Sequence, residues 1–365
     1  MSDVSIDFLG QGLNSETAFA LSNTNGNTNV LRPFIGNDGR SYVSVPTGEY
    51  DAQGKPVYRA QITNSGATLR KNEWEWLDSM VTPVAKKRLQ FVNRLRANGQ
   101  VISFPNAYNH SVYTYQRNTD IGAATIGMNP RSRAENDKVT FDQVSLPLPI
   151  ISKEIEMDAR EIAIRRNGGV PLDTTMVEQA ADRVAEYIEQ LALGTLSTYT
   201  FNGFPLYGLL NFPQRITGSF LNPSVSGWTP SMMFNSVVSM IDAAYNVNRY
   251  GPFDLYYSRG LVPYMLRDYA TNYDGGPLIN KISSIPGIDS VNLLDYMTGN
   301  QLLLVQRSPS TAKVLVGMDI TTVQWQENGG LSQKLRVMGM ILPVMYRDSN
   351  NSTGIVHYSG AATTA

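Results

Sequence analysis

The sequence predicts an α+β protein made of more than one unit. Residues 171–196 carry one long helix with apolar residues at helical spacing. Residues 199–317 alternate short helices and strands, and from residue 313 onward the chain is strand after strand. Helical and strand periodicities that occupy separate runs of one chain are typical of the α+β class.

Length and composition limit the possibilities further. At 365 residues the chain exceeds the usual size of a single hydrophobic core. The formal charge is −1 and Cys is absent, which excludes disulfides and thiolate metal sites and fits a reducing cytoplasm. No run of about 18 apolar residues occurs, and the first ten residues do not resemble a signal peptide. We therefore expect neither a membrane span nor secretion.

Residues 1–68 differ from the rest of the chain. Turn-forming residues surround two short β-like pieces at 41–45 and 56–62, and few residues are available for a core. Such a segment needs a surface to hold it. We expect an arm that lies on a neighbouring subunit.

Residues 69–99 predict two helices. Thr82 and Pro83 suggest a break, with one helix ending near Met80 and a second running from Pro83 to Asn98 before Gly99. The segment is basic, with seven Lys and Arg against three Asp and Glu. The simpler interpretation of these basic residues is a solvated helix face, and the more specific one is a surface that faces a polyanion. The second helix carries Lys86, Lys87, Arg88, Arg94 and Arg96.

A strand at 101–106 is followed by a stretch without helical period. Residues 107–145 alternate polar and apolar positions and predict a long two-stranded excursion, with Arg131, Arg133 and Lys138 near its middle. An isolated hairpin is marginal in water, so this one also needs a partner surface.

The long helix follows a strand and a short helix that ends at Gly168–Gly169. Thr175 and Glu178 suggest a capping box at its start. One apolar stripe is expected, with the charged residues largely off it. The stripe consists of Val177, Ala180, Ala181, Val184, Ile188, Leu191 and Ala192, and the charged set is Asp182, Arg183, Glu186 and Glu189. At a length of about 30 Å, the helix should pack lengthwise on a sheet, because its small residues permit close approach.

The remainder predicts a second compact unit and closing strands. The expected elements are a helix at 230–246, a strand at 253–258, a helix at 261–269, a strand at 301–307 and later strands at 313–327, 334–348 and 354–359.

No motif for catalysis, a cofactor or a metal is visible. The two His residues, His110 and His357, have no partner at metal-ligand spacing, and nucleotide-binding and nucleophile-elbow motifs do not occur. The acidic pairs Glu154/Glu156 and Asp158/Glu161 are more typical of solvated faces than of an acid–base couple. We expect no enzyme activity and no cofactor.

The order of these elements resembles the shell-forming proteins with the Hong Kong 97 fold, which include tailed-phage major capsid proteins and encapsulins. Four stretches carry the resemblance, each weak alone: 69–106 with its Trp-bearing and basic helices, 144–196 with the "PLD…AA…A" helix, LYGLLN at 206–211, and 301–346 with a turn at Val316, Gly317 and Asp319. The resemblance implies a Hong Kong 97-like fold with an N-terminal arm, an extended hairpin loop, a peripheral domain with a long spine helix and an apical α/β domain.

The implied division of the chain is as follows: 1–68 arm; 69–103 first helices of the peripheral domain; 104–146 extended loop; 147–198 peripheral domain with the spine helix; 199–317 apical domain; 318–365 closing peripheral strands. Loops near 272–276 or 286–289 would approach the symmetry axes. Arg131, Arg133 and Lys138 would lie in an inter-subunit loop. Some family members cross-link Lys to Asn, but a solvated or salt-bridged Lys138 is the simpler expectation.

The implied function is that of a major capsid protein, assembled from pentamers and hexamers into the head of a tailed phage around double-stranded DNA. Lys86, Lys87, Arg88, Arg94 and Arg96 would include DNA-facing residues. The virion would form in the host cytoplasm, with portal, scaffold or cement proteins as further partners. An encapsulin-type shell around a cargo enzyme is the alternative. Two other classes also remain open. One is a hydrolase or carbohydrate-binding protein built on the aromatic clusters, which would be a monomer or a small oligomer, and the other is a phage tail component, which would form tubes or rings.

Overall fold

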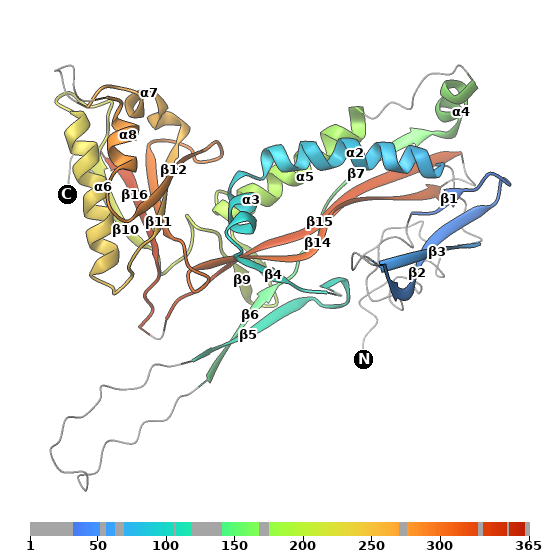
Figure 1. The fold of residues 1–365 in the computed structure, drawn as a ribbon, viewed down its shortest axis with the longest axis horizontal. Helices are drawn as coiled ribbons and strands as arrows, with labels where there is room; N and C mark the ends of the chain where they lie inside the picture. The colour runs from blue at the N-terminus through green and yellow to red at the C-terminus, as the bar shows by residue number, and fades with distance from the viewer. Residues whose placement is uncertain are drawn as a thin grey trace, which may run out of the picture.

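The computed structural model describes residues 32–51, 56–62, 69–105, 107–118, 141–167, 175–269, 276–327, 331–348 and 350–361. The molecule is elongated, with two units joined end to end and a hairpin that projects from between them (Figure 1). Each unit combines a sheet with helices, which confirms the α+β prediction. The buried apolar residues form two main clusters, and the larger one extends from the peripheral unit onto the apical sheet through residues such as Tyr256, Leu303 and Ile355.

The larger, peripheral unit is built on a four-stranded sheet. Its order is β4 (Val101–Ser103), β14 (Ala312–Glu327), β15 (Ser332–Met345) and β7 (Ile151–Asp158). β14 and β15 form a long antiparallel pair, β4 joins β14 in parallel, and β7 joins β15 antiparallel. The sheet provides a long, narrow platform for the helices.

Three helices lie along this platform: α2 (Lys71–Arg88), α3 (Gln90–Ala97) and α5 (Thr175–Leu193). All seven predicted stripe residues of α5 are buried. The expected break at Thr82–Pro83 is wrong, because α2 continues through Pro83 and ends at Arg88, with Leu89 as its C-cap. A proline frees the carbonyl four residues earlier, and Ser79 is exposed, so water can satisfy that carbonyl. Leu89 leaves the helical region with ψ 69° while its side chain stays buried.

The second, apical unit contains a five-stranded sheet. Its order is β10 (Ile216–Leu221), β16 (Ile355–Ala361), β13 (Gln301–Gln306), β11 (Phe253–Ser258) and β12 (Ile288–Leu294). The helices here are α6 (Pro230–Tyr245), α7 (Val262–Met265) and α8 (Leu278–Ser283), with a 3₁₀ turn, η4 (Arg259–Leu261), before α7. The helix expected at 261–269 is therefore shorter than predicted, and it ends at Met265.

The prediction that residues 318–365 all close the peripheral domain is wrong at its end. β16 does not join the peripheral sheet; it pairs in parallel with β10 and antiparallel with β13 inside the apical sheet. Val356 is fully buried in the apical core, which explains why the strand belongs there. The chain thus enters the apical unit a second time after β15.

Smaller elements complete the structure. β1 (Phe34–Ile35), β2 (Ser41–Tyr50) and β3 (Pro56–Ile62) form a three-stranded sheet, β5 (Val112–Asn118) pairs with β6 (Phe141–Pro147), and β8 (Tyr199–Phe201) pairs with β9 (Phe204–Leu206). A 3₁₀ turn, η3 (Ala107–Asn109), precedes β5, and α4 (Ala159–Asn167) follows β7. In the described ranges no helix has both the length and the apolar character that crossing a bilayer requires.

Candidate assembly surfaces

The hairpin of β5 and β6 extends from the peripheral unit below its long sheet in Figure 1. The strands are antiparallel with Val112 opposite Pro147, as expected for a two-stranded excursion. Tyr115 fixes the base through an edge-on contact with Tyr346, with ring centroids 5.0 Å apart. Phe141 at the outer end of β6 is 64% exposed. Arg131, Arg133 and Lys138 lie outside the described residues.

The β1–β3 sheet forms a second surface at the end of the peripheral unit, where Phe34 of β1 packs against the core. β3 is its edge strand, and Tyr50, Tyr58 and Ile62 on β2 and β3 are 71%, 45% and 55% exposed. An edge strand with exposed apolar side chains is a surface on which another chain can pack.

Arg32 and Trp74 fix the start of this sheet to α2. Arg32 binds both carboxylate oxygens of Asp78 at 2.7 and 2.8 Å and lies 4.5 Å over the Trp74 ring. The Trp74 indole N–H donates to the Pro33 carbonyl at 3.1 Å. A single guanidinium nitrogen of Arg32, Nη2, makes both contacts with Asp78. Together with the Trp74 contacts, this charge-assisted pair holds the start of the sheet against α2.

The five basic residues predicted to face DNA divide into two groups. Lys86, Lys87 and Arg88 are exposed in the last turn of α2. Arg94 and Arg96 on α3 are half-buried and bind within the chain, to Asn292 and Asp319, each at 2.7 Å. The structure therefore brings together one small exposed basic cluster rather than a surface of five cations.

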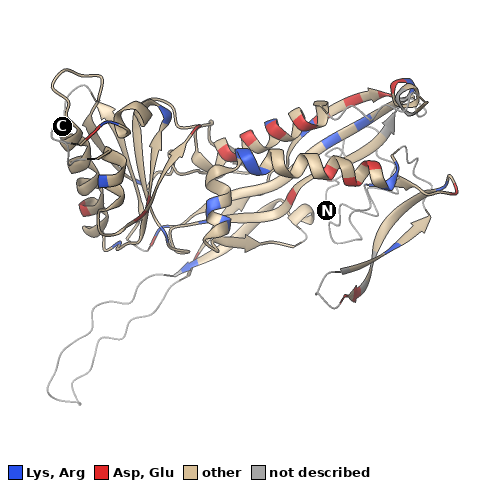
Figure 2. Ribbon diagram, turned by 45° about the horizontal axis from the view of Figure 1, so that its top comes forward, with Lys and Arg blue, Asp and Glu red and all other residues tan. Residues whose placement is uncertain are grey.

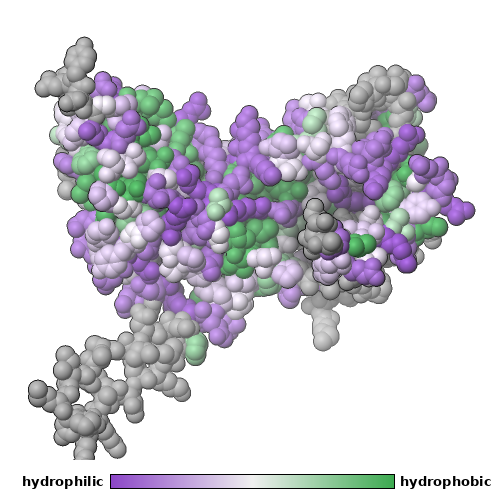
Figure 3. All heavy atoms as spheres, in the orientation of Figure 1, coloured by the Kyte–Doolittle hydropathy of each residue, from purple (hydrophilic) through white to green (hydrophobic). Residues whose placement is uncertain are grey.

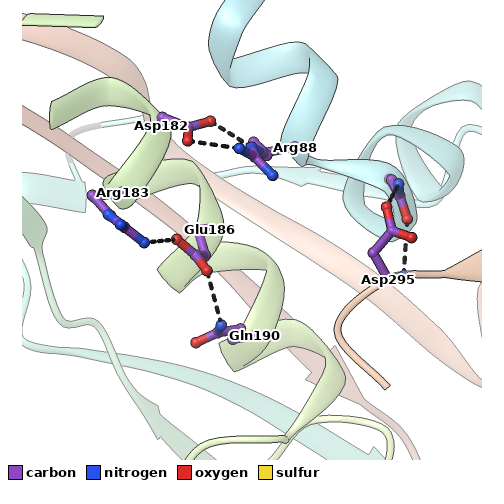
Figure 4. A network of polar contacts seen from close by, with 7 residues as sticks. Arg88, Asp182, Arg183, Glu186, Gln190 and Asp295 are labelled. Atoms are coloured by element: carbon purple, nitrogen blue, oxygen red, sulfur yellow. Dashed lines mark hydrogen bonds and ion pairs between the residues drawn. The ribbon is translucent and has the colours of Figure 1, made fainter. Parts of the chain in front are cut away.

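Acidic side chains accompany this basic cluster. Figure 2 shows acidic segments along both long helices beside the basic ones. Figure 4 shows Arg88 of α2 bound to Asp182 of α5 through both carboxylate oxygens, at 2.5 and 2.9 Å. On the same face of α5, Glu186 accepts from Arg183 at 2.7 Å and from Gln190 at 3.4 Å. Lys86 and Lys87 are thus the exposed cations of this cluster that form no ion pair within the part of the chain that the structure describes.

Glu189 is the polar residue that the sequence interpretation placed incorrectly. It was expected largely off the apolar stripe, but its exposed fraction is 0%. Oε1 accepts the Phe91 N–H at 2.5 Å and Oε2 accepts the Val92 N–H at 3.3 Å, so the carboxyl group satisfies the start of α3. Burial raises the pKa of Glu189 to about 7. The sequence did offer one signal for this burial. Glu189 stands four residues after Ala185 and three before Ala192, a spacing that places it on the same face of the helix as these two buried residues.

The two histidines lie apart, in different units. His110 packs beside Phe104 with ring centroids 5.3 Å apart. His357 on β16 accepts from Arg215 Nε at Nδ1 (3.3 Å), so Nε2 carries the proton toward Gln301 Oε1 at 3.2 Å. Burial and the Arg215 charge lower the pKa of His357 to about 4. Among the described residues, no three His, Cys, Asp or Glu side chains form a group that could hold a metal ion.

The acidic residues considered as an acid–base couple lie on and after the edge strand β7. Glu154 is bound by Arg336 at 2.7 Å and Lys334 at 3.2 Å from the adjacent β15. These contacts make Glu154 part of a cross-strand ion cluster, with Arg336 also lying 4.8 Å over the Trp325 ring.

The fold is similar to that of several solved structures, among them a virus-like particle and a phage capsid. The virus-like particle from Pyrococcus furiosus is 17% identical, with a TM-score of 0.53, over 78% of this chain and 98% of that one. The capsid of Myoviridae phage XM1 is 12% identical, with a TM-score of 0.56, over 75% and 92%. The structure from Mycobacterium phage Bobi is 14% identical, with a TM-score of 0.52, over 74% and 90%. The predicted Hong Kong 97-type fold is confirmed.

The protein family follows from the sequence itself. The profile of a family described as "Family of unknown function (DUF6260)" matches residues 64–357. The chain therefore belongs to that family. No curated protein sequence matches the chain.

Proposed function

We propose that this chain is a major capsid protein, a structural protein without enzyme activity that assembles into the icosahedral head of a tailed bacteriophage. The observation that carries the proposal is the fold, which is shared over about three quarters of the chain with the capsid of Myoviridae phage XM1 and with a structure from Mycobacterium phage Bobi. Subunits of a closed shell make heterologous contacts that form rings of five and six.

The shape of the subunit supports assembly. The β5–β6 hairpin and the β1–β3 sheet both extend away from the two cores and expose large apolar side chains. Hydrophobic residues also gather at the surface of the apical unit, at the left of Figure 3. Such surfaces become stable when a neighbouring subunit covers them. In this proposal the segment that carries Arg131, Arg133 and Lys138 reaches a neighbouring subunit.

The proposed interior ligand is double-stranded DNA, bound through phosphates without sequence preference. Lys86 and Lys87 are the best candidates for these contacts, because Arg88, Arg94 and Arg96 already bind polar groups of the chain. Two phosphate contacts per subunit are individually weak but repeat over a whole shell. Portal, scaffold and cement proteins are further proposed partners, and the host cytoplasm is the proposed site of assembly.

A nanocompartment shell around a cargo enzyme is the second candidate. It is favoured by the match to the Pyrococcus virus-like particle, of which 98% is covered. The contents of the particle separate the two candidates. Particles isolated from the producing cells should contain nuclease-protected double-stranded DNA if the chain is a phage capsid protein. A stoichiometric copurifying enzyme and no protected DNA would favour the nanocompartment.

The experiment for the proposal itself is assembly of the full chain expressed alone. Size-exclusion chromatography and negative-stain electron microscopy should show closed shells, or pentamers and hexamers that close when scaffold is added. A chain that remains a monomer under both conditions would contradict the proposal.

A further inference from the structure

The hairpin of β8 and β9 follows α5 directly and is held firmly at its base. Leu209 and Leu210, just after β9, donate their N–H groups to the last carbonyls of α5, those of Ala192 at 3.1 Å and Leu193 at 2.8 Å. Leu206 at the end of β9 is buried in the larger of the two cores. The hairpin therefore has a fixed direction relative to the long helix.

The turn of the β8–β9 hairpin leaves it little freedom. Asn202 and Gly203 are its two central residues, with φ angles of 50° and 80°. Positive φ at both positions is the mark of a type I′ turn, whose twist matches that of the strands it joins. The turn sets Phe201 directly opposite Phe204.

One face of the β8–β9 hairpin is aromatic. Tyr199 pairs with Leu206 and Phe201 pairs with Phe204. Because alternate residues of a strand share a face, these four side chains lie on the same side of the hairpin. Leu206 is buried, whereas Tyr199, Phe201 and Phe204 are 41%, 37% and 38% exposed. Single exposed apolar side chains are ordinary on a protein surface, but three aromatic ones on one face of so short a hairpin form a patch.

The sequence around this patch carries no charge. Residues 190–214 contain no Asp, Glu, Lys, Arg or His, although 17% of the whole chain is Asp, Glu, Lys or Arg. Aromatic residues without charged neighbours are typical of the centre of a protein–protein interface. A nucleic-acid strand stacked on these rings would also need basic groups for its phosphates, and this stretch supplies none. The aromatic face therefore fits an apolar protein surface.

The exposed area indicates how much more surface a partner must cover. A covered aromatic side chain contributes about 150–250 Å², so three side chains that are about two-fifths exposed offer roughly 200 Å². A stable interface buries about 800 Å² on each partner. The rest must come from the surface beside the patch, where β9 lies against β6 (Figure 1). A partner seated on the aromatic face is therefore in reach of the β5–β6 hairpin as well.

We propose that the aromatic face of the β8–β9 hairpin, formed by Tyr199, Phe201 and Phe204, packs against an apolar surface of a second copy of this chain in the shell. This inference rests on the proposed function, in which the β5–β6 hairpin reaches a neighbouring subunit. The β8–β9 hairpin lies beside it and meets the same neighbour. Burial of the three rings then strengthens the contact between one subunit and the next.

The same charge placed on each face of the hairpin tests the proposal. Phe204→Glu adds a carboxylate to the aromatic face, and Thr200→Glu, at an exposed position on the opposite face, is the matched control. Light scattering after size-exclusion chromatography gives the chain concentration needed for assembly. This concentration should rise at least about ten-fold for Phe204→Glu, because the contact would bury an ionised carboxylate. It should change by less than about two-fold for Thr200→Glu.

The outcomes separate this inference from the proposed function. If the unmodified chain forms shells and the two variants assemble equally well, the inference is overturned and the proposed function stands. A chain that never assembles, with or without scaffold, contradicts the proposed function and this inference together.

Thiol reactivity covers the case in which Phe204→Glu does not fold. The chain has no Cys, so Phe201→Cys gives a single thiol on the aromatic face. Its reaction with a maleimide should be at least about ten-fold slower in assembled shells than in dissociated subunits. Equal rates in the two states overturn the proposal. Protection by an accessory protein on subunits that have not assembled also overturns it, because the partner is then that protein and not a second copy.

Discussion

The packing of α5 between α2 and the peripheral sheet is tested most sharply by Ile188→Ala. Ile188 is fully buried, and its Cδ1 lies 3.5 Å from the position that a Cβ on Gly339 of β15 would take. The substitution removes three carbons, worth about 2.4 kcal/mol of transfer free energy, and leaves a cavity whose walls are a helix and a sheet. We expect a loss of about 3–4 kcal/mol in the free energy of unfolding.

Urea denaturation followed by tryptophan fluorescence provides the assay, since Trp74 and Trp325 lie in the peripheral unit. Gln179→Ala is the control on the same helix, because Gln179 is exposed and its loss should change the free energy of unfolding by less than about 0.5 kcal/mol. Equal effects of the two substitutions would refute the conclusion that α5 is packed against the sheet along this stripe.

Three further predictions concern charge. The pKa of Glu189 is raised to about 7, so the folded chain holds more protons than the unfolded chain above pH 4.5. The free energy of unfolding should therefore fall by up to roughly 3 kcal/mol as pH rises from 4.5 to 7. In urea titrations, Glu189→Gln should flatten this pH dependence. The pKa of His357 is lowered to about 4, so the pH dependence of stability that it causes has the opposite sign. The apical unit should lose stability as pH falls from 6.5 toward 4. The thermal unfolding temperature of His357→Gln should lack this dependence on pH. Because the Arg88–Asp182 pair is partly exposed, a double-mutant cycle with Arg88→Ala and Asp182→Ala should give a coupling of about 1 kcal/mol or less, and 1 M NaCl should remove it; a coupling that persists in salt would contradict this.

Features that depend on local periodicity were predictable from the sequence. The apolar stripe of α5 is buried at every predicted position, because helix spacing alone decides which residues share a face. Most strand positions in the apical and closing regions were recovered for the same reason. The hairpin of β5 and β6 was visible in the alternation of its residues.

Features that depend on distant partners were not predictable. The role of Glu189 comes from amides 97 and 98 positions away in sequence, so a charged residue that looked solvated is buried. The separation of Arg94 and Arg96 from Lys86 and Lys87 follows from contacts with Asn292 and Asp319.

Predictions from local sequence were also wrong at two places, where tertiary packing determines the end of a helix and the sheet that a strand joins. Pro83 is tolerated because its turn of α2 is exposed, and the helix instead ends where Leu89 enters the core. The placement of β16 in the apical sheet depends on pairing with β10, more than 130 residues earlier in sequence, which no local pattern reports.

The central claim is that this chain builds a closed shell, and cryo-electron microscopy of the purified full-length protein tests it most directly. We expect particles with five-fold vertices whose density accommodates the two-unit subunit, with the β5–β6 hairpin and the β1–β3 sheet in contact with neighbouring copies. Open tubes, or a monomer that stays unassembled with scaffold present, would contradict it.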